Sequence, residues 1–105
     1  MGQNKYRNVP TEVEGILFQS MHEARRYQDL RLLERAGQIS GLETQPKYII
    51  SVNGVRICSY SADFRYVENG QVVVEDAKSG GTRTPQYRLK VKLMKAVHGI
   101  TIRET

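Results

Sequence analysis

The feature that most constrains the fold is the dipeptide Asn69-Gly70, which separates two runs of strand-forming residues. Asn-Gly between such runs predicts a two-residue type I′ turn, and this turn sets the register of the hairpin that it closes. Counting outward from the turn, Asp63 lies opposite Asp76. Because directly opposite residues point to the same face of a sheet, the two carboxylates are expected side by side.

The same register places the neighbouring charged residues. Lys78 lies two residues beyond Asp76 on the same face, opposite Ser61, whereas Glu75 points to the other face, opposite Phe64. A salt bridge or a surface position is therefore expected for Glu75. A slip of one residue would exchange the two acids, but the spacing to Lys78 favours Asp76 as the working carboxylate.

Two carboxylates directly across a ladder repel each other and destabilise the sheet. A divalent cation reverses that effect, because hard cations such as Mg²⁺ prefer carboxylate oxygens. A nearby lysine can position a nucleophilic water or offset developing phosphate charge. The set is typical of phosphodiester cleavage. The alternative is a solvated acidic pair at the end of an edge strand, with Lys78 as its ion-pair partner, and a β-bulge would break the alignment.

The apolar periodicity predicts an α/β fold with the order α-β-β-β-α-β, a mixed sheet flanked by two helices. The first helix spans 20–36, with Ser20 and Glu23 in a capping-box pattern and Gly37 as its stop. Residues 38–44 are expected to be a connection, and the second helix to run from Thr84 or Pro85 to about Val97. The strands are expected at 45–52, 57–67, 72–78 and the final ITIRE stretch, and residues 1–19 are expected to form short strands or an extended N-terminal arm.

Composition places the chain among single-domain globular proteins. It has 105 residues, of which 39% are hydrophobic and 26% charged. The apolar runs are too short to span a membrane, and the polar start shows no signal peptide, so we expect a cytoplasmic protein. One cysteine and two distant histidines exclude an internal disulfide, a zinc knuckle and a c-type haem site.

The positive charge is concentrated near the end of the chain. The net charge is +5, yet residues 78–103 hold seven basic residues and no acid, while the remainder is net negative. This asymmetry indicates a polyanionic partner such as DNA, and its alternative is a solvated basic helix face. No base-reading motif is visible, so recognition of DNA shape or backbone is expected. The predicted contacts are Arg83, Arg88, Lys90, Lys92 and Lys95, with Leu89, Leu93, Ala96 and Val97 on the apolar side of the helix.

The strings ADF (62–64) and VEDAKSG (74–80) resemble the signature of the PD-(D/E)XK nuclease superfamily. In that signature an Asp at one strand end is followed, across a hairpin, by (Asp/Glu)-X-Lys, here Asp63 and Asp76-Ala77-Lys78. The resemblance implies a restriction-endonuclease-like core and one or two Mg²⁺ (or Mn²⁺) ions. The implied ligands are Glu23 from the first helix, Asp63, Asp76 and the carbonyl of Ala77, with Lys78 positioning the water.

More narrowly, the chain is similar to a family of small phage- and prophage-encoded proteins of this superfamily. The matching stretches are KYRN, GILFQSMHEARRYQDL, GQISGLETQPKY, YSADFRY and VVEDAKS. Two positions depart from the signature: Ala62 stands in place of its Pro, and Ser79 in place of a frequent Gly. Gln45 matches a Gln of the pattern and is a candidate substrate contact, its alternative being a polar strand end. For Glu23 the alternative is the capping box alone.

This family is reminiscent of phage endonuclease I-type Holliday-junction resolvases. The resemblance therefore implies a Mg²⁺-dependent DNA endonuclease of phage recombination or replication, acting as a homodimer on branched DNA, because two cuts need two sites. If the protein is phage-encoded, its compartment is the host cytoplasm. The alternatives are a nuclease for linear or single-stranded DNA and a catalytically idle DNA-binding or assembly module.

Overall fold

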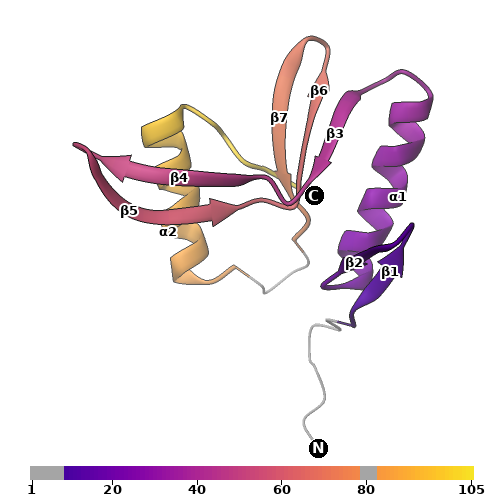
Figure 1. Ribbon diagram of the computed structural model, residues 1–105, viewed down its shortest axis with the longest axis horizontal. Helices are drawn as coiled ribbons and strands as arrows, with labels where there is room; N and C mark the ends of the chain where they lie inside the picture. The colour runs from indigo at the N-terminus through magenta and orange to yellow at the C-terminus, as the bar shows by residue number, and fades with distance from the viewer. Residues whose placement is uncertain (1–8, 79–82) are drawn as a thin grey trace, which may run out of the picture.

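A four-stranded mixed sheet organises the fold in the computed structural model, which describes residues 9–78 and 83–105 (Figure 1). The strand order is β3-β6-β7-β8, with antiparallel pairs except for the parallel pair β7–β8. The last strand returns after a helical crossover, which is how parallel neighbours are joined. The strands are β3 (Ser40–Thr44), β6 (Phe64–Glu68), β7 (Gln71–Asp76) and β8 (Arg103–Glu104).

The hairpin formed by β6 and β7 has the predicted turn and register. Asn69 and Gly70 both have positive φ, 51° and 76°, as a type I′ turn requires. The ladder runs from Glu68 opposite Gln71 to Phe64 opposite Glu75. The prediction from Asn69-Gly70 is therefore confirmed over all five pairs of the ladder.

Helix α1 (Met21–Arg35) covers one face of the sheet. Its N-cap is Ser20, whose Oγ accepts a hydrogen bond from the Glu23 amide at 3.1 Å, and its end at Ala36 precedes Gly37. The buried side chains of the helix are packed against Phe18 and Phe64, and with them they form the first hydrophobic core: Ala24, Tyr27 and Leu30. The start and the stop read from the sequence are both confirmed.

A short hairpin precedes α1, within the segment expected as an N-terminal arm. It consists of β1 (Thr11–Val13) and β2 (Ile16–Phe18), paired antiparallel. Phe18 is fully buried in the first core, with its ring 4.9 Å from that of Tyr27. The described part of the arm is therefore packed onto the body of the protein.

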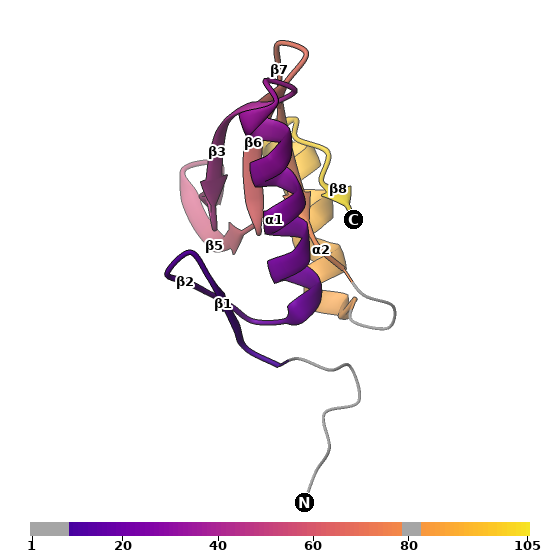
Figure 2. The same ribbon diagram turned by 90° about the vertical axis from the view of Figure 1, so that its right-hand side faces the viewer.

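The opposite face of the sheet is covered by α2 (Pro85–Leu93) and the π-helix η1 (Met94–His98) (Figure 2). Thr84 caps α2 by accepting from the amide of Tyr87 at 3.0 Å. Within residues 9–78 and 83–105, no helix has the length and apolar character needed to cross a membrane. The second core joins this helical layer to the sheet and contains Ile50, Tyr60, Ala62, Val74, Met94 and Ile102.

The expected apolar side of the second helix is largely wrong. Leu89 is 58% exposed, and Ala96 and Val97 are also exposed. The side that packs onto the second core instead carries Tyr87, Val91 and Met94, which are also spaced at i, i+4 and i+7. The sequence contains two apolar stripes at helical spacing. The π-helix Met94–His98 then changes the direction in which the last side chains point, relative to a regular α-helix.

The chain between α1 and β6 differs most from expectation. The expected connection 38–44 contains β3, and the expected strand 57–67 is divided into β5 (Val55–Ser61) and β6. Strand β5 pairs with β4 (Lys47–Val52) in a separate two-stranded sheet, and Ser61 lies opposite Lys47, not opposite Lys78. The chain changes partners at Asp63, so the apolar residues that alternate along 57–67 enter two cores: Cys58, Tyr60 and Ala62 the second, Phe64 and Tyr66 the first.

The expected first strand, 45–52, is β4 and lies outside the main sheet, where β3 from the expected connection takes its place. When β1–β2 and β4–β5 are set aside, α1, β3, β6, β7, α2 and β8 follow one another as α-β-β-β-α-β. The mixed α/β class, with a helix on each face of the sheet, is therefore confirmed.

Candidate active site

Asp63 and Asp76 meet at the end of the β6–β7 ladder. The Asp63 amide donates to Oδ1 of Asp76 at 3.0 Å and to the carbonyl oxygen of Glu75 at 3.1 Å. In return, the Ala77 amide donates to Oδ2 of Asp63 at 2.8 Å. The two side chains thus exchange hydrogen bonds with each other's strand, and the neighbourhood predicted from the turn is found.

Charge repulsion is concentrated in this pair. Burial raises the pKa of Asp63, and the carboxylates of Asp76 and Glu23 raise it further. Burial also raises the pKa of Asp76, although hydrogen bonding to Tyr60 and the charge of Lys78 oppose the change. A neighbouring carboxylate raises a pKa in this way at Asp63, whereas at Asp76 burial alone raises the pKa. The pair is therefore an anionic centre suited to a cation.

Glu23 reaches this centre from the first turn of α1. Its side chain is buried, with 6% of the residue exposed. Burial raises its pKa, a backbone hydrogen bond from Gln19 lowers it, and the charge of Asp76 raises it. The hydrogen bond from the Glu23 amide to the Ser20 hydroxyl, which is one half of a capping box, is present. The Glu23 carboxyl also lies close enough to Asp76 for their charges to interact. A capping role therefore accounts for only part of its environment.

Lys78 is held between the sheet and α2. Its ammonium nitrogen lies 3.9 Å from the centre of the Tyr87 ring, a cation–π distance, and its amide donates to the carbonyl of Thr105 at 2.7 Å. The Tyr87 hydroxyl in turn donates to Glu104 at 2.7 Å. Lys78 is thus positioned by α2 and the C-terminal strand rather than by the expected cross-strand neighbour Ser61.

Glu75 is separated from the candidate site by the pleat of β7. It is fully buried on the α1 side and accepts hydrogen bonds from Arg26, Tyr66 and Thr105. Burial raises its pKa, but these hydrogen bonds outweigh burial and leave the pKa below its usual value. The salt-bridge expectation is confirmed, and the surface position is wrong.

Tyr60 is a site residue that sequence reasoning missed. Its hydroxyl donates to Oδ2 of Asp76, and burial together with this hydrogen bond raises its own pKa. The residue belongs to the second core, as its place in the apolar alternation predicts. Nothing in that alternation distinguishes a core tyrosine from one whose hydroxyl holds a carboxylate.

The donor chemistry of the site fits Mg²⁺. Within residues 9–78 and 83–105, no group of three or more His, Cys, Asp or Glu side chains is placed to hold a metal ion together. Mg²⁺ is nevertheless often bound by only one or two carboxylates, with water and substrate phosphate completing its shell. The buried carboxylate of Asp76 and the half-buried carboxylate of Asp63 match that smaller set. Glu23 and the carbonyl of Ala77 remain predicted ligands.

The predicted DNA contacts come from two separate parts of the chain. The backbone of Gln45 is beside it, because its amide donates to the carbonyl of Asp63 at 2.9 Å, and its side chain is exposed. Arg83 is paired with Glu104 at 2.8 Å. The remaining four are on α2 and η1, where Lys90 is half-buried and three are exposed: Arg88, Lys92 and Lys95.

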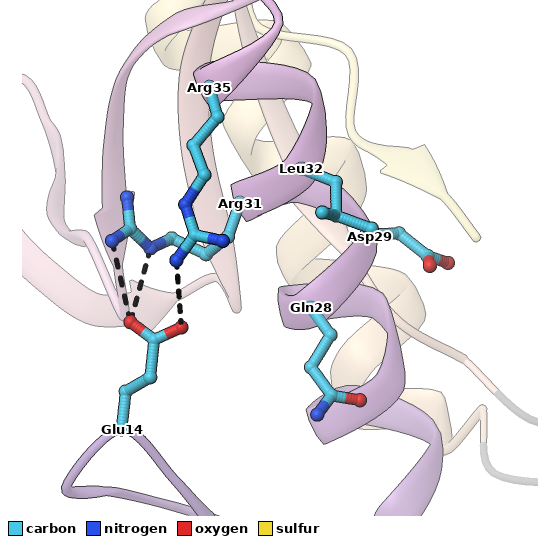
Figure 3. Close-up of a pocket in the computed structure, with 6 residues that line it drawn as sticks. All are labelled: Glu14, Gln28, Asp29, Arg31, Leu32 and Arg35. Carbon is cyan, nitrogen blue, oxygen red and sulfur yellow. Dashed lines mark hydrogen bonds and ion pairs between the residues drawn. The ribbon is translucent and has the colours of Figure 1, made fainter.

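A surface groove of about 410 Å³ lies away from these residues, on the outer side of α1 (Figure 3). Glu14 from the β1–β2 turn points into it and faces Arg31 and Arg35, at 3.4 and 3.9 Å. The groove contains no predicted site residue. The ion pairs of Glu14 with Arg31 and Arg35 tie the first hairpin to α1.

Residues 3–100 match the family described as "Protein of unknown function (DUF1064)", and the chain belongs to that family. Neither the curated proteins nor the solved structures contain a significant match.

Proposed function

We propose that this protein is a Mg²⁺-dependent (or Mn²⁺-dependent) DNA endonuclease with a restriction-endonuclease-like core. The observation that carries the proposal is the carboxylate pair of the half-buried Asp63 and the buried Asp76, which have raised pKa values and Lys78 beside them. Two carboxylates held this close repel each other, and a divalent cation between them would remove that repulsion. The α-β-β-β-α-β order and the resemblance to the PD-(D/E)XK superfamily support the same assignment.

Each side chain has a distinct role in this proposal. The metal supplies charge neutralisation at the scissile phosphate and activation of a water. Asp63, Asp76, Glu23 and the Ala77 carbonyl would hold it. The Tyr60 hydroxyl orients the Asp76 carboxylate, and the Lys78 ammonium holds the attacking water and offsets developing negative charge.

The preferred substrate is branched DNA of the Holliday-junction type, cut by a homodimer in which each chain contributes one site. The exposed cations of α2 and η1 would contact the phosphate backbone, which gives affinity without sequence information. Phage DNA recombination or replication, in the cytoplasm of the host, is the proposed setting. A nuclease of the same fold for linear or single-stranded DNA is the nearest alternative.

A second candidate is a DNA-binding or assembly module without catalysis. The observation that favours it is the occupancy of the carboxylate oxygens: both oxygens of Asp76 and one of Asp63 already accept hydrogen bonds from protein groups. A carboxylate oxygen can accept further partners, so this does not exclude a metal. It does make an idle site a concrete rival.

The deciding experiment is a cleavage assay with Mg²⁺ on three DNA substrates: a four-way junction, a linear duplex and a single strand. Asp76→Ala and Lys78→Ala are assayed beside the wild type. The proposal expects junction cleavage that requires Mg²⁺ and is reduced at least about 100-fold in both variants. Binding without cleavage of any substrate would favour the idle module, and full activity of Asp76→Ala would refute the site.

A further inference from the structure

The β4–β5 hairpin, residues 47–61, forms an arm outside the four-stranded sheet (Figure 1). An isolated two-stranded hairpin is at best marginally stable in water, so an arm of this kind needs support from a neighbour. One face supplies that support, because Ile50 and Tyr60 are buried in the second core with Met94 of η1. The His98 ring also bonds the carbonyl of Ile49 at 2.8 Å.

The other face of the arm is uncovered, and its composition is distinctive. The register places Lys47 opposite Ser61, Ile49 opposite Ser59 and, beyond a bulge, Ser51 opposite Arg56. Both cations are exposed, and the arm also exposes four large apolar side chains: Ile49, Val52, Val55 and Ile57. The whole arm contains no acidic residue. This outer face thus combines two cations with three serine hydroxyls, which are the groups that contact phosphate oxygens in protein–DNA complexes.

The base of the arm adjoins the candidate active site. The Ala62 amide donates to the carbonyl of Pro46 at 3.0 Å, and Asp63 follows directly. Tyr60, near the end of β5, reaches Asp76 through its hydroxyl. Because Tyr60 lies on the buried face, the outer face meets the candidate site only at the base of the arm, where Lys47 lies opposite Ser61. Lys47 is at the base, and Arg56 is four residues further along, about 13 Å at ~3.3 Å per residue.

We propose that the outer face of the arm binds the phosphate backbone of duplex DNA that flanks the candidate active site. Charge decides between DNA and a second copy of the chain as the occupant. Two copies of this face would bring four cations together without an acid, whereas a DNA strand offers phosphates along its whole length. A two-stranded ribbon is also narrow enough to enter the major groove. The inference rests on the proposed function only in taking DNA as the ligand.

The test measures binding without cleavage. Fluorescence anisotropy of a labelled 30-base-pair duplex is recorded in EDTA over a range of NaCl concentrations, for the wild type and for Lys47→Gln/Arg56→Gln. The matched control is Arg25→Gln/Arg35→Gln, which removes two exposed cations from α1. We expect the arm variant to bind at least about 10-fold more weakly at 0.1 M NaCl, with its salt slope reduced by about 2, and the control to bind as the wild type does.

Equal binding by the arm variant and the control would overturn the inference. So would failure of the wild type to bind the duplex, or an unchanged salt slope with a smaller oligomer in light scattering, which would identify the face as an interface between copies. Circular dichroism checks that the variants are folded. The cleavage assay separates the two proposals: arm-dependent binding without cleavage retains the arm and rejects the nuclease, and cleavage with arm-independent binding does the reverse.

Discussion

Arg26 on α1 and Glu75 on β7 form a two-point ion pair across 49 residues of sequence, with Nε–Oε2 at 2.6 Å and Nη2–Oε1 at 3.0 Å. Glu75 is fully buried and the Arg26 side chain is 24% exposed. The pair fastens α1 to the sheet one turn after Glu23. It therefore sets the position from which Glu23 reaches the carboxylates, while Glu75 itself is kept out of the candidate site.

Glu75 and Asp76 are adjacent on β7, yet we expect Glu75 to matter for stability and Asp76 for cleavage. Arg26→Ala leaves Glu75 buried without its cation, and we expect a loss of about 2–4 kcal/mol in the free energy of unfolding by urea. Asp76→Asn gives up one accepted hydrogen bond but removes a charge that repels Asp63 and Glu23, so it should lose less of that free energy than Arg26→Ala while abolishing cleavage. Arg26→Met/Glu75→Leu should lose less stability than Arg26→Ala alone. If Arg26→Ala has the same free energy of unfolding as the wild type, the ion pair does not stabilise the fold.

The stability of the metal-free protein should fall as pH rises. Folding raises the pKa of Asp63 from 3.8 to about 8, through burial and then the charges of Asp76 and Glu23. Because the pKa of Asp63 is higher in the folded than in the unfolded state, protonated Asp63 stabilises the fold fully below about pH 4. This stabilisation is lost as pH rises through about 8. In EDTA, the melting temperature of Asp63→Asn minus that of the wild type should therefore increase between pH 5 and pH 8.5. A constant difference would contradict this, and Asp29→Asn, an exposed site on α1, is the control.

Tyr60→Phe tests the hydroxyl that holds Asp76. The Tyr60 hydrogen bond lowers the pKa of Asp76 against the effect of burial, so its removal lets the carboxyl keep its proton to higher pH. Single-turnover cleavage should fall by about 10- to 100-fold, and the acid limb of its pH profile should move to higher pH. Tyr48→Phe, on the same arm, should change neither quantity. A rate loss without any shift of the profile would mean that Tyr60 acts only through packing.

Tyr87 offers a graded test of the position of Lys78. The ring contacts the ammonium at 3.9 Å, whereas the hydroxyl is bonded to Glu104. Tyr87→Phe keeps the ring and should retain most of the cleavage rate, and Tyr87→Leu removes it. Because an exposed cation–π contact is worth about 0.5–1 kcal/mol, we expect a loss of roughly 2- to 5-fold for Leu relative to Phe. Equal rates for the two variants would show that the ring does not position Lys78.

The parts of the structure that sequence predicted are those set by short-range rules. The turn at Asn69-Gly70 determines its own register, and Ser20 and Gly37 mark the ends of α1 through local capping. These elements also bring Asp63 to Asp76. That is why half of the candidate site could be placed without the structure.

The parts that sequence missed depend on partners far along the chain. Alternation continues unchanged through Ala62, so nothing local reveals that the strand leaves β4 at Asp63 and joins β3 and β7. Strand β3 contains Gly41 at φ +64°, and its register is irregular, so it has little strand character in sequence. The hydroxyl of Tyr60 and the guanidinium of Arg26 find their carboxylates only in the folded protein.

The central claim is that Asp63 and Asp76 together form a divalent-cation site, and Mn²⁺ binding tests it most directly. The electron paramagnetic resonance signal of free Mn²⁺ is followed during titration into wild type, Asp63→Asn, Asp76→Asn and the control Asp29→Asn. We predict one or two Mn²⁺ ions per chain bound at millimolar concentration by the wild type and the control, and weaker or absent binding in the other two variants. Equal Mn²⁺ binding by all four proteins, or none by the wild type, would contradict the account.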